Sequence, residues 1–162
     1  MDAAGINKLF RELGLTLGSV ESFTGGNFAG EITSISGASH FFKGSLVTYA
    51  TEEKNRILSI PYEMIDKYGV VSAEIAGEMA SRGRALLNVD YCISFTGNAG
   101  PSSMENKPVG EVYIGIAFAN KTQVFTYHLT GDRENIQKEA IKIAYEILEN
   151  ILIKNDQTPT IK

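Results

Sequence analysis

The stretch Val20-Glu21-Ser22-Phe23-Thr24-Gly25-Gly26 joins a strand pattern to a helix pattern, and this junction indicates the fold class of the chain. An apolar run from Leu13 to Val20, typical of a short buried strand, precedes it, and a helical pattern begins near Asn27. Helix N-terminal N–H groups point out of such a turn and favour anions, while glycines let a ligand approach the backbone closely. Two interpretations remain open: one wall of an active site with Ser22 as its nucleophile, or only a tight connection.

Strand and helix patterns alternate along the chain. The expected helices are Asp2–Leu13, Gly26–Ile35, Thr51 to about Ser59, Pro61 to about Lys67, Ala73–Leu87 and Glu134–Ile153. The expected strands are Leu15–Val20, the run ending at Leu46–Tyr49, Val89–Thr96, Glu111–Ala119 and Thr122–Leu129, the last two joined by a hairpin. This order predicts one α/β domain over residues 1–155, with helices on both faces of a mixed sheet. A frayed polar tail is expected over residues 156–162.

Length and composition exclude several classes of protein. The 162 residues suit one domain with one core, and a net charge of -4 without a basic cluster argues against nucleic acid as a partner. No segment approaches the ~20 apolar residues of a membrane span. The single cysteine, Cys92, lies in an apolar run and is expected to be buried in a strand rather than catalytic. With no signal-peptide pattern at the N-terminus, we expect a cytoplasmic protein.

Metal and cofactor motifs are absent from the sequence. The two histidines, His40 and His128, form no HExxH pattern, and there is no CxxC, GxGxxG or Walker A motif. His128 alternates with its strand neighbours, so it is expected to face solvent or to pack on the sheet rather than to join a triad. We therefore expect no metal and no cofactor.

Three loops rich in small polar groups are the remaining candidates for a site. They span residues 22–26, 96–101 and 130–133, and each follows an expected strand. In open α/β sheets ligands bind at the carboxyl ends of the strands, so parallel strands would bring the first two loops together.

A serine nucleophile needs a base, and Lys54 is the candidate in the absence of a suitable histidine. It lies near a helix start, where the helix dipole disfavours a positive charge, and burial would lower its pKa further. Tyr49, at a strand end, would relay a proton or orient Lys54. The alternative is an ordinary solvated lysine beside Glu52 and Glu53.

Collinear motifs extend over roughly residues 15–153. They are Glu21-Ser22-x-Thr24-Gly25-Gly26, Gly37-Ala38-Ser39, Phe42-x-Gly44-x-x-Val47-x-Tyr49, Lys54, Gly69-Val70-Val71-Ser72, Thr96-Gly97-x-Ala99-Gly100-Pro101, Lys107-Pro108-Val109-Gly110 and Gly131-Asp132-Arg133. In this set the chain resembles the C-terminal domain family of the competence/damage-inducible protein CinA, in its stand-alone form.

That resemblance implies a three-layer α/β/α sandwich and nicotinamide-nucleotide amidase activity, in which nicotinamide mononucleotide and water give nicotinate mononucleotide and ammonia. It implies a serine nucleophile assisted by a lysine and a tyrosine without a metal, and these roles carry over to Ser22, Lys54 and Tyr49. Family members are often dimers or larger, so we expect a homo-oligomer.

Substrate contacts are expected from all three loops. Backbone N–H groups of Thr24, Gly25 and Gly26, or of Thr96 and Gly97, would stabilise the oxyanion. Gly100 belongs to the same central loop and is expected at the substrate. Arg133 is the candidate for the nucleotide phosphate, and its alternative is a capping or ion-pair role with Asp132 or Glu134.

The chain departs from the family pattern at three places. Phe23 stands where the family usually has cysteine, Asn98 stands where an aliphatic residue is usual, and residues 102–106 replace a longer glycine-rich loop. A large aromatic beside Ser22 would reshape or obstruct the pocket. The alternative functions are therefore a catalytically impaired nucleotide-binding or protein-interaction module with the same fold, and hydrolysis of another amide or a phosphorylated ligand.

Overall fold

The apolar run before Ser22 forms strand β1 in a computed structural model, which describes residues 1–156. The helices are α1 (Ala3–Leu13), α2 (Asn27–Thr33), a 3-10 turn η1 (Ala38–His40), α3 (Thr51–Arg56), α4 (Tyr62–Tyr68), α5 (Ala73–Leu87) and α6 (Arg133–Asp156). The strands are β1 (Leu17–Glu21), β2 (Phe42–Val47), β3 (Tyr91–Gly97), β4 (Glu111–Phe118) and β5 (Lys121–His128). Every strand and helix expected from the sequence is present, and η1 is an addition within an expected loop.

The five strands form one mixed sheet in the order β2-β1-β3-β4-β5. Strand β1 runs parallel to both β2 and β3, whereas β4 and β5 continue the sheet antiparallel. The parallel pairing that the site hypothesis required is confirmed. The loops after β1, β2 and β3 therefore leave the sheet at the same edge.

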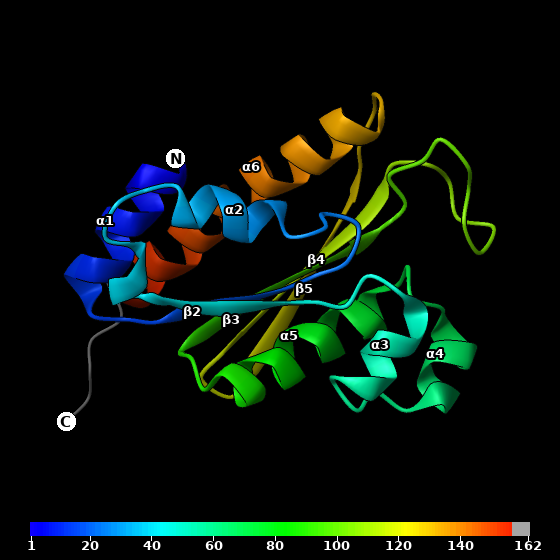
Figure 1. Cartoon of the computed structure of the whole chain (residues 1–162), viewed down its shortest axis with the longest axis horizontal. Helices are drawn as coiled ribbons and strands as arrows, with labels where there is room; N and C mark the ends of the chain where they lie inside the picture. The colour runs from blue at the N-terminus through cyan, green and yellow to red at the C-terminus, as the bar shows by residue number, and fades with distance from the viewer. Residues whose placement is uncertain (157–162) are drawn as a thin grey trace.

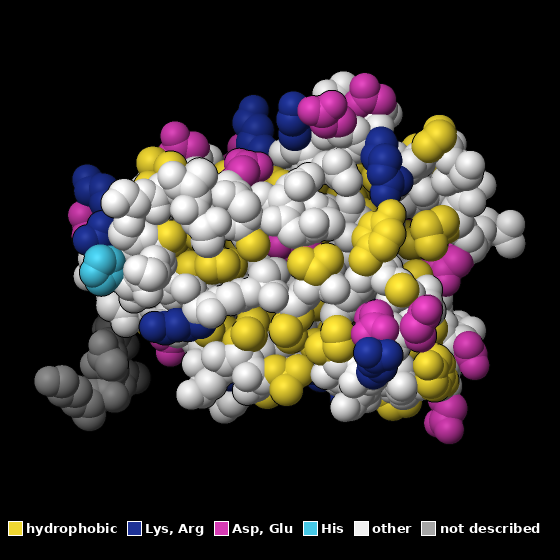
Figure 2. Space-filling view, viewed as in Figure 1, with side chains coloured by type: hydrophobic (Ala, Val, Ile, Leu, Met, Phe, Trp, Pro, Cys, Tyr) yellow, Lys and Arg dark blue, Asp and Glu magenta, His cyan; other side chains and the backbone are white. Residues whose placement is uncertain are grey.

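Helices cover both faces of this sheet, which confirms the three-layer α/β/α architecture. Helices α1, α2 and α6 lie on one face, and α3, α4 and α5 lie on the other (Figure 1). Each face has its own apolar cluster, one built around Phe10, Phe28 and Ile136 and the other around Ile75 and Met79. Figure 2 shows hydrophobic side chains between the two helix layers on the face that carries the edge strand β2.

Three helix starts are set by side-chain caps. The side chains of Asp2, Ser72 and Asp132 accept hydrogen bonds from the backbone N–H three residues later, at 2.9, 3.2 and 2.9 Å. Each such cap contributes about 1 kcal/mol by satisfying an otherwise unpaired N–H group.

Several element ends differ by a few residues from the sequence expectation, and two of the differences have a clear structural cause. Strand β2 ends at Val47, because that residue pairs with Glu21, the last residue of β1, and Tyr49 has no partner strand beyond it. Helix α6 continues to Asp156, past the expected end, because its last turns are anchored: Leu152 is buried and Asn155 Nδ2 donates to Tyr91 Oη at 3.1 Å. Residues 157–162 of the expected tail lie outside the described residues.

Helix α5 approaches the sheet most closely at a glycine. A Cβ atom on Gly83 would lie 3.0 Å from Cys92 Sγ and would overlap the side chain of Val20, whereas a Cβ on Gly77 would meet its nearest atom at 3.5 Å. We therefore expect Gly83→Ala to destabilise the fold by about 1–3 kcal/mol through overpacking. Gly77→Ala is the matched control and should be neutral or stabilising by up to about 1 kcal/mol, from helix propensity alone. Thermal unfolding of both variants checks this; equal melting temperatures would contradict it.

Candidate active site

A cavity of about 330 Å³ opens at the carboxyl edge of the parallel strands. It is bounded by residues from the loops after β1, β2 and β3, from α3, from the segment before α5 and from the start of α6. Its lining includes Ser22, Phe23, Tyr49, Thr51, Lys54, Val70, Thr96, Gly97, Asn98, Ala99, Gly100, Pro101, Ser102, Met104 and Arg133. Seven of the ten residues assigned to the site from the sequence are in this set; the other three are Thr24, Gly25 and Gly26.

The structure brings Ser22 and Lys54 into direct contact. Lys54 Nζ lies 2.9 Å from Ser22 Oγ and donates to the carbonyl oxygen of Thr48 at 2.6 Å. Ser22 is largely buried at the end of β1, and Lys54 is only 1% exposed on α3. A serine hydroxyl and a lysine amine at this distance have the geometry of a nucleophile and its base.

The environment of Lys54 shifts its amine toward the neutral form that a base requires. Burial lowers the pKa of Lys54 from 10.5 to about 8, while the negative charges of Glu105 and Glu52 act in the opposite direction. No carboxylate forms an ion pair with this lysine within residues 1–156. Desolvation is therefore the dominant cause, and the alternative of a solvated surface lysine does not describe Lys54.

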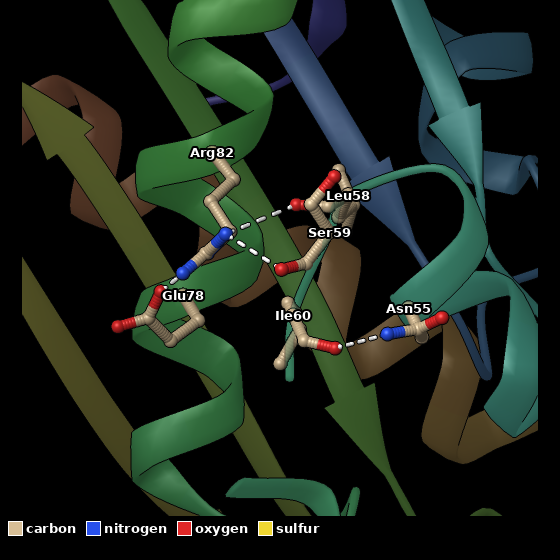
Figure 3. A network of polar contacts seen from close by, with 6 residues as sticks. All are labelled: Asn55, Leu58, Ser59, Ile60, Glu78 and Arg82. Carbon is tan, nitrogen blue, oxygen red and sulfur yellow. Dashed lines mark hydrogen bonds and ion pairs between the residues drawn. The ribbon is translucent and has the colours of Figure 1, made fainter. Parts of the chain in front are cut away.

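A polar network fixes the far end of the short helix α3, which carries this lysine. In Figure 3, Arg82 of α5 donates to the carboxylate of Glu78 at 2.6 Å and to the carbonyl of Ser59 at 2.8 Å. Asn55 Nδ2 donates to the carbonyl of Ile60 at 2.9 Å in the same region. These hydrogen bonds tie the segment after α3 to the long helix α5. The position of the short helix α3 is therefore stabilised by contacts beyond its own six residues.

Glu21 supplies the anion at the N-terminus of α2. Its fully buried carboxylate accepts hydrogen bonds from the N–H groups of Phe28 and Ala29 at 3.0 and 3.1 Å. It also accepts from the hydroxyls of Thr24 and Ser45 at 2.8 and 3.1 Å. The sequence correctly indicated an anion-binding turn, but the structure fills it with a side chain of the chain itself.

The turn residues Thr24, Gly25 and Gly26 therefore do not lie against the cavity. The Thr24 hydroxyl is bonded to Glu21, and the Gly25 N–H donates to the carbonyl of Ser22 at 3.0 Å. Their φ angles of 58° and 95° at Gly25 and Gly26 suit glycine. In this structure the three residues shape the turn that presents Ser22, and the expectation that they line the substrate site is corrected.

Tyr49 lies at the mouth of the cavity and not within the Ser22–Lys54 pair. Its side chain is exposed, and its hydroxyl accepts a hydrogen bond from Arg133 Nη2 at 2.9 Å. The other terminal nitrogen of Arg133 donates to the carbonyl of Gly100 at 2.8 Å. Arg133 thus ties two cavity loops to the start of α6, rather than pairing with Asp132 or Glu134 as the alternative expected.

The central loop after β3 forms part of the cavity wall. The buried hydroxyl of Thr96 donates to the carbonyl of Val70 at 2.6 Å, and Gly97 ends β3 at the cavity. The Asn98 side chain donates to the carbonyl of Lys107 at 3.2 Å and accepts from the N–H of Gly100 at 3.2 Å. Asn98 therefore organises the loop from within, which accounts for an amide in place of an aliphatic side chain.

Phe23 belongs to the hydrophobic core as well as to the cavity wall. Phe23 is 4% exposed and belongs to the apolar cluster under α6. Its backbone carbonyl accepts a hydrogen bond from Gln137 Nε2 at 2.8 Å. The ring does not separate Ser22 from Lys54, which remain 2.9 Å apart. The aromatic substitution is thus compatible with an assembled pair.

Sequence reasoning missed three contributors to the site. They are Glu21 as the internal anion, the Thr48 carbonyl as an acceptor for Lys54, and Glu105, which accepts from the N–H groups of Val70 and Val71. A carboxylate directly before Ser22 was a visible signal, because acids favour the start of a helix. The other two depend on backbone positions that no side-chain pattern reveals.

Residues 1–156 contain neither a cluster of metal-binding side chains nor a helix able to cross a membrane. No group of three or more His, Cys, Asp or Glu side chains there could hold a metal ion. No helix in that range has the length and apolarity needed to cross a membrane.

Comparison with known proteins agrees with the fold and the motifs. A relative from Listeria welshimeri, called a putative competence-damage inducible protein, is 38% identical over 151 residues, which make up 93% of this chain and 36% of that protein. A relative of the same description from Bacillus subtilis is 39% identical over 142 residues, 88% of this chain and 34% of that protein. The chain spans about a third of the length of these relatives.

Solved structures show the same architecture. The competence/damage inducible protein CihA from Agrobacterium tumefaciens superposes with a TM-score of 0.86 at 30% identity, over 91% of this chain and 92% of that chain. The competence damage-inducible protein A from Klebsiella pneumoniae gives a TM-score of 0.89 at 27% identity, over 97% and 96%. The family model of the CinA C-terminal domain matches residues 2–152. The chain therefore belongs to the CinA C-terminal domain family.

Proposed function

We propose that this chain is an amidohydrolase that converts nicotinamide mononucleotide and water into nicotinate mononucleotide and ammonia. The observation that carries the proposal is the buried Lys54 Nζ at 2.9 Å from Ser22 Oγ, on the wall of a cavity. The choice of substrate rests on the family resemblance and on an arginine at the same cavity.

The first half of the reaction acylates Ser22. The neutral Lys54 amine takes the hydroxyl proton as Ser22 Oγ attacks the carboxamide carbon, and the carbonyl oxygen becomes an oxyanion. The resulting Lys54 ammonium then gives its proton to the departing amide nitrogen, which leaves as ammonia. The Thr48 carbonyl holds Nζ in place through both steps.

The second half hydrolyses the acyl-serine ester. Lys54 takes a proton from a water molecule that attacks the ester carbon, and returns it to Ser22 Oγ when the C–O bond breaks. The N–H groups of Phe23 and Ala99 are candidates for the oxyanion site, since both residues line the cavity and neither N–H has a backbone or side-chain acceptor in residues 1–156. An aligned donor of this kind contributes about 10²–10³ in rate.

The cavity suits a small phosphorylated aromatic substrate. Its volume of about 330 Å³ lies in the range of small-molecule sites. Tyr49 offers an exposed aromatic ring at the mouth, where a pyridinium cation would be attracted to the ring face. Arg133 places a guanidinium at the same edge, with the fork geometry that phosphate oxygens accept.

The direct test is incubation of the purified protein with nicotinamide mononucleotide, followed by measurement of ammonia and of nicotinate mononucleotide in equal amounts. A rise in melting temperature with the nucleotide but without ammonia release would overturn the amidase and favour the binding module. Phe23→Cys, which restores the usual family residue, would then show whether the aromatic side chain is the cause.

The activity should depend on pH through Lys54. Because the pKa of Lys54 is lowered to about 8, the base is protonated below this value and neutral above it. At pH 7 only roughly a tenth of the molecules carry the neutral amine, so kcat/KM should rise about fivefold from pH 7 to pH 8 and about tenfold in all before it levels off above pH 9. A profile of kcat/KM from pH 7 to 9.5 checks this. A flat profile would rule out Lys54 as the base.

Removal of the Arg133 guanidinium should weaken substrate binding more than chemistry. We expect Arg133→Met to raise KM for the mononucleotide by about tenfold or more, the scale of a lost charge-assisted hydrogen bond. The nucleoside without its phosphate separates the two roles of Arg133, since its KM should change much less. Arg56→Met, at a side chain that is 79% exposed on α3, is the control. An equal effect on both substrates would show that Arg133 acts only by holding the loops.

A further inference from the structure

The loop after β3 contains a tight turn with an unusual residue at its centre. Lys107 N–H donates to the carbonyl of Met104 at 2.7 Å, and the two residues between them, Glu105 and Asn106, have φ angles of 52° and 58°. Such a turn needs left-handed conformations at both central positions, which suits asparagine or glycine. Glutamate there costs roughly 1 kcal/mol, so an interaction elsewhere must compensate.

The Glu105 carboxylate makes that interaction with the segment before α5. Its two oxygens accept the N–H groups of Val70 and Val71, both at 2.9 Å. The carbonyls of the same two residues are also bonded, to the Thr96 hydroxyl at 2.6 Å and to Lys107 Nζ at 2.8 Å. The backbone polar groups of this extended pair are thus all satisfied by the loop and by the end of β3.

The preceding glycine is required for this arrangement. Gly69 has a φ angle of 77°, and a Cβ atom on it would lie 2.6 Å from Glu105 Oε2. Any side chain there would both strain the backbone and displace the carboxylate. The glycine of the Gly69-Val70-Val71-Ser72 motif therefore makes room for Glu105.

The contact between Glu105 and the Val70–Val71 backbone lies next to Ser22 and Lys54. Val70 and Met104 line the cavity together with Ser22 and Lys54. Glu105 is the larger of the two carboxylate influences on Lys54, the other being Glu52 at the start of α3, and both favour the charged amine. The Ser22 hydroxyl and the Thr48 carbonyl are the groups in direct contact with Nζ.

We propose that Glu105 is a positioning residue of this site: its carboxylate clasps Val70 and Val71 and so holds the 102–107 loop as a cavity wall. From that position its negative charge favours the charged form of the Lys54 amine. The importance of Glu105 for catalysis rests on the proposed function. Glu105 also gives the short loop, which departs from the usual family pattern, a means of closing the site without a glycine-rich insertion.

The experiment compares two substitutions by NMR in the ligand-free protein. Glu105→Gln is isosteric, keeps one acceptor oxygen and removes the charge. Glu105→Asn suits the left-handed turn but is too short to reach both N–H groups. Glu63→Gln, at an exposed position on α4, is the control. The readouts are the pH titration of the Lys54 side-chain amine and the hydrogen exchange rates of the Val70 and Val71 amides.

Removal of the Glu105 charge should lower the Lys54 titration midpoint by roughly 0.3 pH unit or more in both variants. Amide exchange should accelerate about tenfold or more at both valines in Glu105→Asn, and at one of them in Glu105→Gln. An unmoved titration, or unchanged exchange in both variants, would each overturn the proposal. If Glu105→Asn fails to fold, the isosteric variant decides alone.

These readouts do not depend on turnover. A protein that releases no ammonia yet shows both changes would refute the proposed function and leave the role of Glu105 intact. In an active enzyme, the midpoint of the kcat/KM profile should move to lower pH in step with the Lys54 titration.

Discussion

Ser22→Ala should reduce ammonia release from nicotinamide mononucleotide by at least about 10³-fold, the scale found when a nucleophilic serine is removed from a hydrolase. The reason is that the hydroxyl forms the acyl bond, and no neighbouring group in contact with Lys54 can replace it: its other bonded partner is the carbonyl of Thr48. Nucleotide binding should survive, because Arg133 and Tyr49 lie apart from this pair.

The control for this loss is a serine away from the cavity. Ser39 is exposed within η1, so Ser39→Ala should retain full turnover. Both variants should melt within a few degrees of the wild type, since the Ser22 change removes only one oxygen at the cavity surface. Ammonia release by Ser22→Ala within tenfold of the wild-type rate would mean that Lys54 activates water directly and that Ser22 is not the nucleophile.

The covalent intermediate offers a second measurement on the same residue. Acid quenching of wild-type protein during turnover should trap an adduct equal in mass to the substrate minus ammonia, located on the peptide that contains Ser22. The adduct should be absent from the alanine variant.

The fold was largely predictable because its signals are local. The apolar run before Ser22 and the hairpin between β4 and β5 each depend on residues a few positions apart. The end of β2 was not predictable in the same way, since it is set by where β1 stops pairing. That is a property of two strands and not of one pattern.

The site was predictable only in part. Ser22 stood out by its turn, but spacing alone left Lys54 as an ordinary surface lysine, and the family resemblance selected it. Lys54 is buried by tertiary packing, and the sequence around it gives no signal of that burial. For Tyr49 the sequence predicted a contact with the lysine, whereas the structure pairs it with Arg133, 84 residues away.

Glu21 and Glu105 show why a motif can be recognised correctly while the contacts of its residues are predicted wrongly. The glycine turn after Ser22 was interpreted as a place for a substrate oxyanion, yet the Thr24 hydroxyl and the N–H groups of Phe28 and Ala29 that follow it all donate to Glu21. Gly69 had no assigned role from the sequence, because its partner, Glu105, lies in a loop 36 residues later. Both cases involve a carboxylate that meets backbone groups, and backbone N–H groups carry no sequence signal.

Lys54→Met should abolish turnover while leaving the fold at least as stable at pH 7. The activity loss, at least about 10²-fold, follows from removal of the general base. Lys54→Arg should lose as much, because a guanidinium keeps its proton at every pH at which the protein is folded and cannot act as a base. The exposed lysine Lys43 provides the control, and Lys43→Met should leave turnover unchanged.

The difference in stability between wild type and Lys54→Met should depend on pH, because the pKa of Lys54 differs between the folded and unfolded states. The pKa of Lys54 is about 8 in the folded chain against 10.5 for the free side chain, so below pH 8 the folded state bears the cost of a buried charge, of order 3 kcal/mol. Between pH 8 and 10.5 the unfolded state binds more protons, and wild-type stability should rise with pH. Methionine removes that cost but leaves the Thr48 carbonyl without its donor, an offset of about 1–3 kcal/mol.

We therefore expect Lys54→Met to melt at the wild-type temperature or a few degrees above it at pH 7, with its advantage shrinking as the pH approaches 10. Melting curves at pH 7, 8.5 and 10 check both parts. A variant that is several degrees less stable at pH 7, or whose difference from wild type does not change with pH, would show that Lys54 is held as a stable cation. Such a cation at 2.9 Å from Ser22 Oγ could donate a hydrogen bond to the serine but could not accept its proton. Catalysis by this pair thus requires the same unfavourable burial that makes the lysine costly to the fold.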